Sequence, residues 1–137
     1  MLCEIELLLK FNEYNGFMKL EIKYNDTVML IEPETERRVI IQVELPIVIN
    51  FIVSDKDMDI DTAIDSNGNI ICDKHIHLTE IVIDHYKVPS RILDEIVLLG
   101  THNKSTGSYF GINGIATINF TENNAFKQYI VYENSTR

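Results

Sequence analysis

Residues 54–77, SDKDMDIDTAIDSNGNIICDKHIH, hold the densest run of side chains in this sequence that could do chemistry. Six aspartates lie in it, and five of them follow one another at every second or fourth position: Asp55, Asp57, Asp59, Asp61 and Asp65. On a strand, the first four would point to one face, about 6.8 Å apart at successive positions. Two unit charges at that distance repel by only about 0.6 kcal/mol in water, so such a row needs no cation.

Calcium is the metal that this row could bind. It takes about six to eight oxygen ligands, so the backbone would have to curl to bring more than two carboxylates together. The EF-hand register fails, because aligning Gly68 with the glycine of that loop places Ala63 and Lys74 at its first and twelfth positions. We favour a solvated acidic strand edge or loop, and keep a calcium site at the five aspartates as the alternative.

A pair of histidines, His75 and His77, lies on one face of a predicted strand, with Glu80 beyond them. This pattern resembles the metal-binding strand of the cupins, and the resemblance would imply a jelly-roll metalloprotein. The spacing departs from that family, since Glu80 has the opposite parity and no second histidine motif follows. Two histidines hold a transition metal only with a third ligand, so we interpret them as an outward-facing pair.

Motifs for covalent catalysis are absent from the sequence. It contains no G-x-S-x-G, no P-loop and no G-x-G-x-x-G. Cys3 and Cys72 are too few for a disulfide framework, and both are expected to be reduced and partly buried. Cys72 lies in an apolar run, which favours an inert core thiol. We therefore expect no catalytic residues and no enzymatic activity.

Aromatic side chains in or beside predicted loops could form a shallow sugar-binding surface. The candidates are Tyr86, Tyr109 and Phe110. Tryptophan, the strongest platform for stacking on a sugar ring, is absent. Loop aromatics also serve as half-buried lids over a core, so this signal is weak.

Charge and length narrow the class of protein. The 137 residues carry a formal net charge of −9, of which residues 1–69 contribute −8 with 14 acidic and 6 basic side chains. The longest basic run is Arg37-Arg38, so nucleic-acid binding is not expected. The first residues lack a basic segment and include Glu4 and Glu6, and no apolar run approaches the ~20 residues of a membrane span. These features predict synthesis in the cytoplasm and no membrane partner.

The elements that must position these side chains are strands. Apolar and polar residues alternate in GFMKLEIKY and RVIIQVEL, IVINFIV is apolar on both faces, and about ten such runs occur. Clusters such as YNDT, DSNGN and TENN separate them, and Asn67-Gly68 predicts a hairpin turn. One helical turn is expected at 90–94, followed by a strand. The chain is thus predicted to be all-β: one antiparallel β-sandwich domain over residues 1–137, jelly-roll-like, with at most one short helix.

Three functions fit these observations. The one we favour is a non-enzymatic β-sandwich that contacts other protein subunits in a homo- or hetero-oligomeric assembly, for example as a structural or accessory subunit of a phage virion. The alternative is a calcium-assisted carbohydrate-binding module, and the third is a cupin-like metalloprotein. The first needs no cofactor, and the second needs calcium.

Overall fold

The computed structural model describes residues 2–57, 59–90, 93, 98–99, 104–105, 108–111 and 113–120. Nearly all of them lie in strands or in the turns between strands. The strands are β1 (Leu2–Asn12), β2 (Lys19–Tyr24), β3 (Thr27–Ile31), β4 (Glu36–Glu44), β5 (Ile47–Ser54), β6 (Thr62–Ile64), β7 (Ile70–Asp73), β8 (His75–Ile83), β9 (Tyr86–Lys87), β10 (Leu98–Leu99), β11 (Lys104–Ser105), β12 (Tyr109–Phe110) and β13 (Gly114–Phe120).

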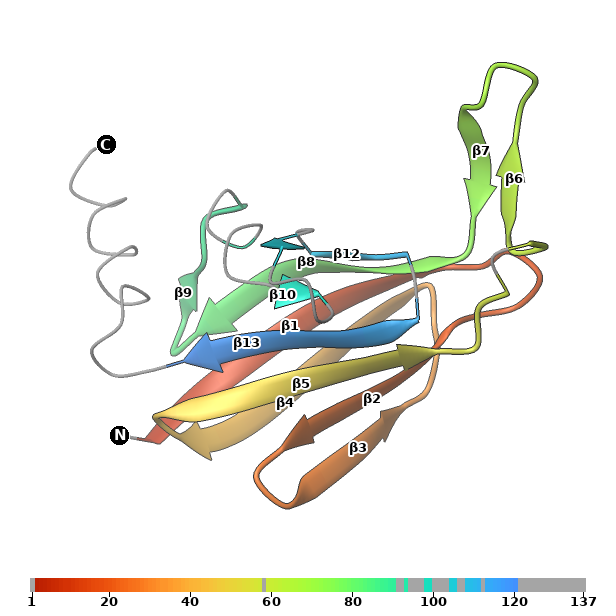
Figure 1. Ribbon diagram of the computed structural model, residues 1–137. Helices are drawn as coiled ribbons and strands as arrows, with labels where there is room; N and C mark the ends of the chain where they lie inside the picture. Colours follow the sequence, from red (N-terminus) through yellow and green to blue (C-terminus); the bar gives the residue numbers. More distant parts are fainter. Residues whose placement is uncertain are drawn as a thin grey trace.

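Two antiparallel sheets pack face to face (Figure 1). One has the strand order β12-β8-β1-β4, with β9 also paired to β8, and the other has the order β11-β10-β13-β5-β2-β3. The β-sandwich predicted from the sequence is therefore confirmed. Its jelly-roll refinement, and the assignment of residues 1–137 to one domain, stay predictions.

The alternating patterns place the core where the sequence predicts it. Leu20 and Ile22 of β2 are fully buried, and Val39, Ile41 and Val43 of β4 are at most 5% exposed. Since successive side chains of a strand point to opposite faces, the residues between them point away from the core, among them Lys19 of β2 and Ile40 and Gln42 of β4. The apolar side chains of both sheets form one cluster between the two layers.

The strand β5 is central in its sheet, between β13 and β2, as its apolar character predicts. Its inward residues Ile47, Ile49, Phe51 and Val53 are buried, whereas Val48 on the other face is 45% exposed. Among the described residues, the outer face of β5 is thus only partly covered.

The segment after β9 contains the one predicted helical turn. Ser90 and Leu93 have helical backbone, and the Leu93 amide donates to the Pro89 carbonyl at 3.0 Å. Other residues of that predicted turn lie outside the described ranges, while the predicted strand after it includes β10. Within the part of the chain that the structure describes, no helix has the length and apolarity needed to cross a membrane.

The β6–β7 hairpin projects beyond the end of the two sheets (Figure 1). Gly68 in its turn has φ 84°, which confirms the predicted Asn-Gly hairpin. Because the hairpin stands away from the sandwich, its apolar side chains stay outside the core: Ile70 and Ile71 are more than 60% exposed. Cys72 is exposed as well, so the expectation of a buried core thiol is wrong for this residue, whereas Cys3 is buried; both are free.

The turn of this hairpin gives a first testable prediction. Gly68→Val should lower the free energy of opening the hairpin by about 1 kcal/mol or more, because a β-branched residue is strained at positive φ. The Asn67 and Asn69 amides, both bonded to Asp65 Oδ1 at 2.9 Å, should then exchange with solvent about fivefold faster or more. Hydrogen exchange measures this.

The matched control is Gly114→Ala in β13. An added Cβ at Gly114 meets no atom within 4 Å, and no positive φ is found there. Unchanged exchange at Asn67 and Asn69 in the Gly68→Val protein would contradict the assigned turn.

Candidate functional site

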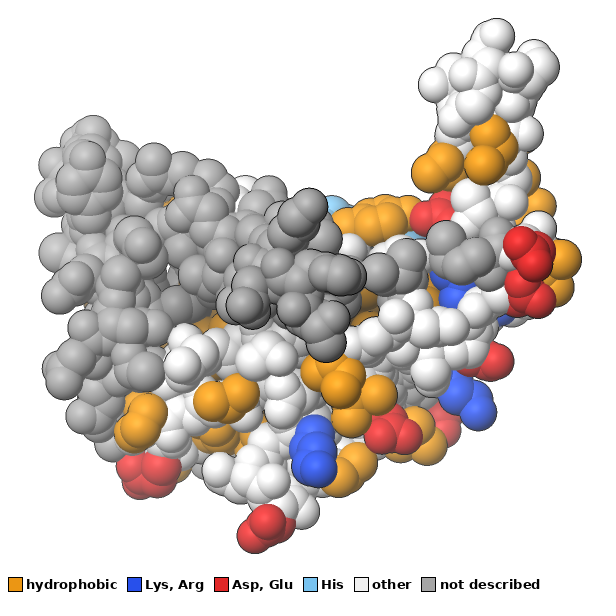
Figure 2. All heavy atoms as spheres, in the orientation of Figure 1, with side chains coloured by type: hydrophobic (Ala, Val, Ile, Leu, Met, Phe, Trp, Pro, Cys, Tyr) orange, Lys and Arg blue, Asp and Glu red, His pale blue; other side chains and the backbone are white. Residues whose placement is uncertain are grey.

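A pocket of about 420 Å³ opens beside the loop 55–61, which joins β5 to β6. It lies at the base of the projecting hairpin, where acidic side chains gather on the surface (Figure 2). Most of its wall consists of charged and amide side chains. The lining residues are Asn15, Asp55, Lys56, Asp57, Ile60, Asp61, Lys74 and Asn113.

Lys56 anchors the loop to two other parts of the chain. Its ammonium group lies 2.5 Å from Asp73 Oδ1 and 2.5 Å from the Gly111 carbonyl oxygen, and its side chain is only 1% exposed. Its backbone is held by Asn113, whose amide side chain accepts from the Lys56 N–H at 3.0 Å and donates to the Lys56 carbonyl at 2.8 Å. The loop is thereby tied to β7 and to the segment between β12 and β13.

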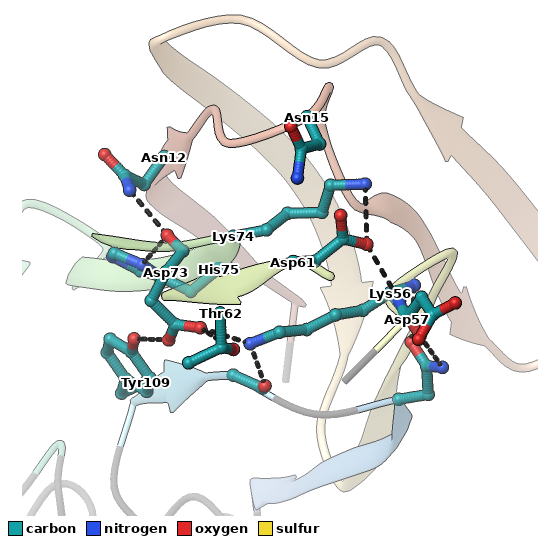
Figure 3. Close-up of polar contacts among 12 residues, drawn as sticks. Asn12, Asn15, Lys56, Asp57, Asp61, Thr62, Asp73, Lys74, His75 and Tyr109 are labelled. Carbon is teal, nitrogen blue, oxygen red and sulfur yellow. Dashed lines mark hydrogen bonds and ion pairs between the residues drawn. The ribbon is translucent and has the colours of Figure 1, made fainter. Parts of the chain in front are cut away.

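Asp73 collects the hydrogen bonds at the base of the hairpin (Figure 3). Its carboxylate accepts from Lys56 Nζ, from Thr62 Oγ1 at 2.7 Å and from the Tyr109 hydroxyl. Burial by itself would raise the pKa of Asp73, but these three donors outweigh it and lower that pKa. Burial and the bond to Asp73 raise the pKa of Tyr109, so its hydroxyl stays protonated as a donor.

Lys74 and Asp61 form a second ion pair inside the pocket wall. Lys74 Nζ lies 3.2 Å from Asp61 Oδ2 and 3.2 Å from the Asp55 carbonyl oxygen, and both side chains are at most 6% exposed. Asp61 Oδ2 also accepts from the Asp57 amide at 2.8 Å. This backbone hydrogen bond, with further ones from Lys74 and Asn15, lowers the pKa of Asp61.

The five aspartates proposed from the sequence have three different environments. Asp55, Asp57 and Asp59 are exposed on the loop, as expected for a surface feature. Asp61 is the exception, because it is buried in its pair with Lys74. Asp65 lies in the hairpin turn, where its carboxylate caps the Asn67 and Asn69 amides.

The row does not lie on one strand. The strand β5 ends at Ser54, and Asp55 has φ 73°, which turns the chain out of the sheet. The strand-edge form of the prediction is therefore wrong, and the loop form holds for Asp55, Asp57 and Asp59 but not for the buried Asp61. Among the described residues, no three histidine, cysteine or acidic side chains come together as metal ligands. Calcium at these five aspartates stays a prediction.

The aromatic candidates are also separated. Phe110 is fully buried and packs on Phe51, with ring centroids 5.7 Å apart, so its ring faces the core rather than a ligand. Tyr109 and Tyr86 are partly exposed, but they pair with His77 and Ile83 respectively, six residues apart along β8. At about 3.3 Å per residue, that places them about 20 Å apart, too far for one shallow sugar site.

The two histidines lie beside Tyr109. The His75 ring stacks on the Tyr109 ring at 4.3 Å between centroids, and the His77 ring lies at 6.4 Å. His75 Nδ1 is 3.1 Å from the Asp73 carbonyl oxygen, and Glu80 pairs with Lys87 at 3.1 Å. Glu80 is thus engaged elsewhere, and the cupin-like arrangement has no third ligand among the described residues.

Sequence reasoning missed Lys56, Lys74, Asp73 and Asn113. A signal was present for Lys56, which interrupts the acidic stretch SDKDMD, whereas Lys74 follows a single aspartate in CDKH. A lone lysine among aspartates is a candidate for an internal ion pair, because the acidic neighbours offset the cost of burying it. Asn113 gave no such signal.

A scan against protein-family models found no match, and a search of curated proteins found none either. A search of solved structures found a calcium-dependent carbohydrate-binding module, vCBM60, crystallised in its selenomethionine form. The match covers 85% of this chain and 90% of that one, with a TM-score of 0.54 and 11% sequence identity. At that identity the likeness concerns the fold.

Proposed function

We propose that this chain is a non-catalytic carbohydrate-binding β-sandwich whose site is the pocket beside loop 55–61. The fold likeness to a carbohydrate-binding module supports the class of function. The observation that carries the proposal is the pocket itself: an open cavity of about 420 Å³ at one end of the sandwich, with exposed carboxylates on its rim. Ligand sites combine such a cavity with a few convergent polar groups.

The rim offers the contacts that a sugar needs. Asp55 is exposed, and its carboxylate takes part in no hydrogen bond or ion pair with another described residue, so we propose that it accepts from sugar hydroxyls. Asp57 uses Oδ1 to accept the Asp59 amide at 2.9 Å, which orients its side chain. Ile60, 60% exposed, provides apolar surface for the C–H face of a sugar ring. The acidic rim favours a neutral glycan over one that carries carboxylates.

The similar structure is described as calcium-dependent. The carboxylates of this pocket, however, are poorly suited to bind calcium. Asp61, the buried carboxylate of the pocket wall, is paired with Lys74. A calcium-assisted form of the proposal therefore rests on the exposed Asp55, Asp57 and Asp59 alone. Our proposal is that the sugar hydroxyls donate hydrogen bonds to the rim carboxylates directly, without a bound metal ion.

A glycan array followed by calorimetry on its strongest neutral ligand tests the proposal. The Asp55→Asn/Asp57→Asn protein should lose at least about tenfold in affinity, because two charge-assisted hydrogen bonds become neutral ones. Asp26→Asn, an exposed aspartate between β2 and β3, should bind like the wild type. Absence of any glycan ligand, or equal affinity of both variants, would contradict the assignment.

A second candidate, contact with other protein subunits, is favoured by the projecting hairpin. Ile64, Ile70 and Ile71 of β6 and β7 are each about 60% exposed. Hydrophobic side chains that project from a domain are typical of interaction surfaces. Light scattering on the same sample separates the two: a stable oligomer without glycan binding would favour this candidate. The comparisons give no support to its virion form.

A further inference from the structure

Two lysine ammonium groups in the pocket wall lie against carboxylate and backbone carbonyl oxygens (Figure 3). Each contacts one carboxylate oxygen and one backbone carbonyl oxygen. For Lys56 these are Asp73 Oδ1 and the Gly111 carbonyl, and for Lys74 they are Asp61 Oδ2 and the Asp55 carbonyl. Carboxylate and backbone carbonyl oxygens are the atoms that calcium collects in proteins.

The four contacts join segments that are distant along the chain. Lys56 links the start of loop 55–61 to the end of β7 and to Gly111. Lys74, between β7 and β8, contacts both ends of the same loop, at Asp55 and Asp61. A bound calcium ion can hold a loop in the same way, because it collects carboxylate and carbonyl oxygens from several segments.

Both lysines are buried, with exposed fractions of 7% for Lys56 and 5% for Lys74. A buried charge is tolerated when it is paired and hydrogen-bonded, as both are here. The carboxylates of Asp73 and Asp61 already have these ammonium groups as their charged partners. Asp61 additionally accepts the Asp57 amide, and Asp73 additionally accepts from Thr62 and Tyr109.

We infer that the ammonium groups of Lys56 and Lys74 take the structural place of a divalent cation, so that residues 55–57 and 59–61 are held in place without calcium. A calcium ion beside Asp61 would meet the positive charge of Lys74 and lack a free carboxylate there. The pocket would then differ from the fold neighbour, which is described as calcium-dependent. This inference does not require that a sugar binds, because its tests measure stability alone.

Thermal melting of the full chain is the direct test. Midpoints are compared in millimolar calcium chloride, in millimolar magnesium chloride and in sodium chloride of matched ionic strength. We expect equal midpoints, since a ligand raises the midpoint only if it binds the folded state. A rise of several degrees with calcium alone, abolished in Asp57→Asn/Asp59→Asn, would overturn the inference. The comparison of salts is made on the wild-type protein first, so it tests the inference even if a lysine variant fails to fold.

The second arm removes one ammonium group. Lys74→Met keeps the apolar stem of the side chain up to the Cε position, removes the ammonium group, and leaves Asp61 and the Asp55 carbonyl without their cation. Its midpoint should fall by several degrees, whereas Lys19→Met, at an exposed position of β2, should melt like the wild type. A Lys74→Met protein as stable as the wild type would show that this ammonium does not hold the loop. Glycan affinity is measured separately. If no glycan binds, the two melting experiments still test whether the lysines replace a cation.

Discussion

Asp73→Ala is expected to destabilise the protein by about 3–5 kcal/mol, the usual cost of removing one partner from a buried ion pair. The change leaves the Lys56 ammonium, whose side chain is 1% exposed, with the Gly111 carbonyl as its remaining partner. It also removes the acceptor of Thr62 and Tyr109. Urea denaturation monitored by circular dichroism measures the effect.

Two further variants show whether the loss comes from the ion pair. Tyr109→Phe removes one donor to Asp73 and keeps Lys56 in place, so it should cost only about 0.5–1.5 kcal/mol. Lys56→Met combined with Asp73→Ala should cost less than the two single changes added together, because neither charge is then left alone. An Asp73→Ala protein no less stable than Tyr109→Phe would contradict the buried network.

Phe110→Ala is expected to cost about 3–5 kcal/mol, the range for removing a buried phenylalanine side chain. The Phe110 ring has no exposed surface and packs on Phe51, so its loss leaves a cavity between the two sheets. Urea denaturation again measures the change. The result also separates two roles for this residue, since a ring that served a ligand would leave stability nearly unchanged.

The matched control is Tyr86→Ala. Tyr86 was proposed beside Phe110 as a binding residue, and its side chain is 58% exposed on β9. Its removal should change the free energy of unfolding by no more than about 0.5 kcal/mol, as is usual at the surface. A Phe110→Ala protein as stable as Tyr86→Ala would contradict the burial of the Phe110 ring.

Local features of the sequence were enough to predict the sandwich. Met18, Leu20 and Ile22 alternate with charged residues, and the structure buries all three. Period two is a property of each strand alone, so it can be recognised without knowing which strands pair. The Asn67-Gly68 turn was predictable for the same reason, because positive φ is a local demand that glycine meets.

The site required the tertiary structure. The lysine at 56 meets Asp73, 17 residues away, and the Gly111 carbonyl, 55 residues away, and nothing in the spacing of these residues along the chain indicates either contact. The aspartates were conspicuous, yet β5 ends at Ser54 and Asp55 has φ 73°, so they do not share one strand face. Tertiary contacts pair Asp61 with Lys74, and the hairpin turn uses Asp65 as a cap.

Burial of individual side chains shows the same division. Cys72 lies in the apolar stretch NIIC and Phe110 lies among glycines in GSYFGING, and sequence reasoning placed the first in the core and the second at a surface site. The structure exposes Cys72 and buries Phe110. An apolar pattern indicates that burial of the side chain would be favourable in free energy. Whether a second layer covers it depends on how the sheets pack, and the β6–β7 hairpin projects beyond both sheets while β12 lies along β8 (Figure 1).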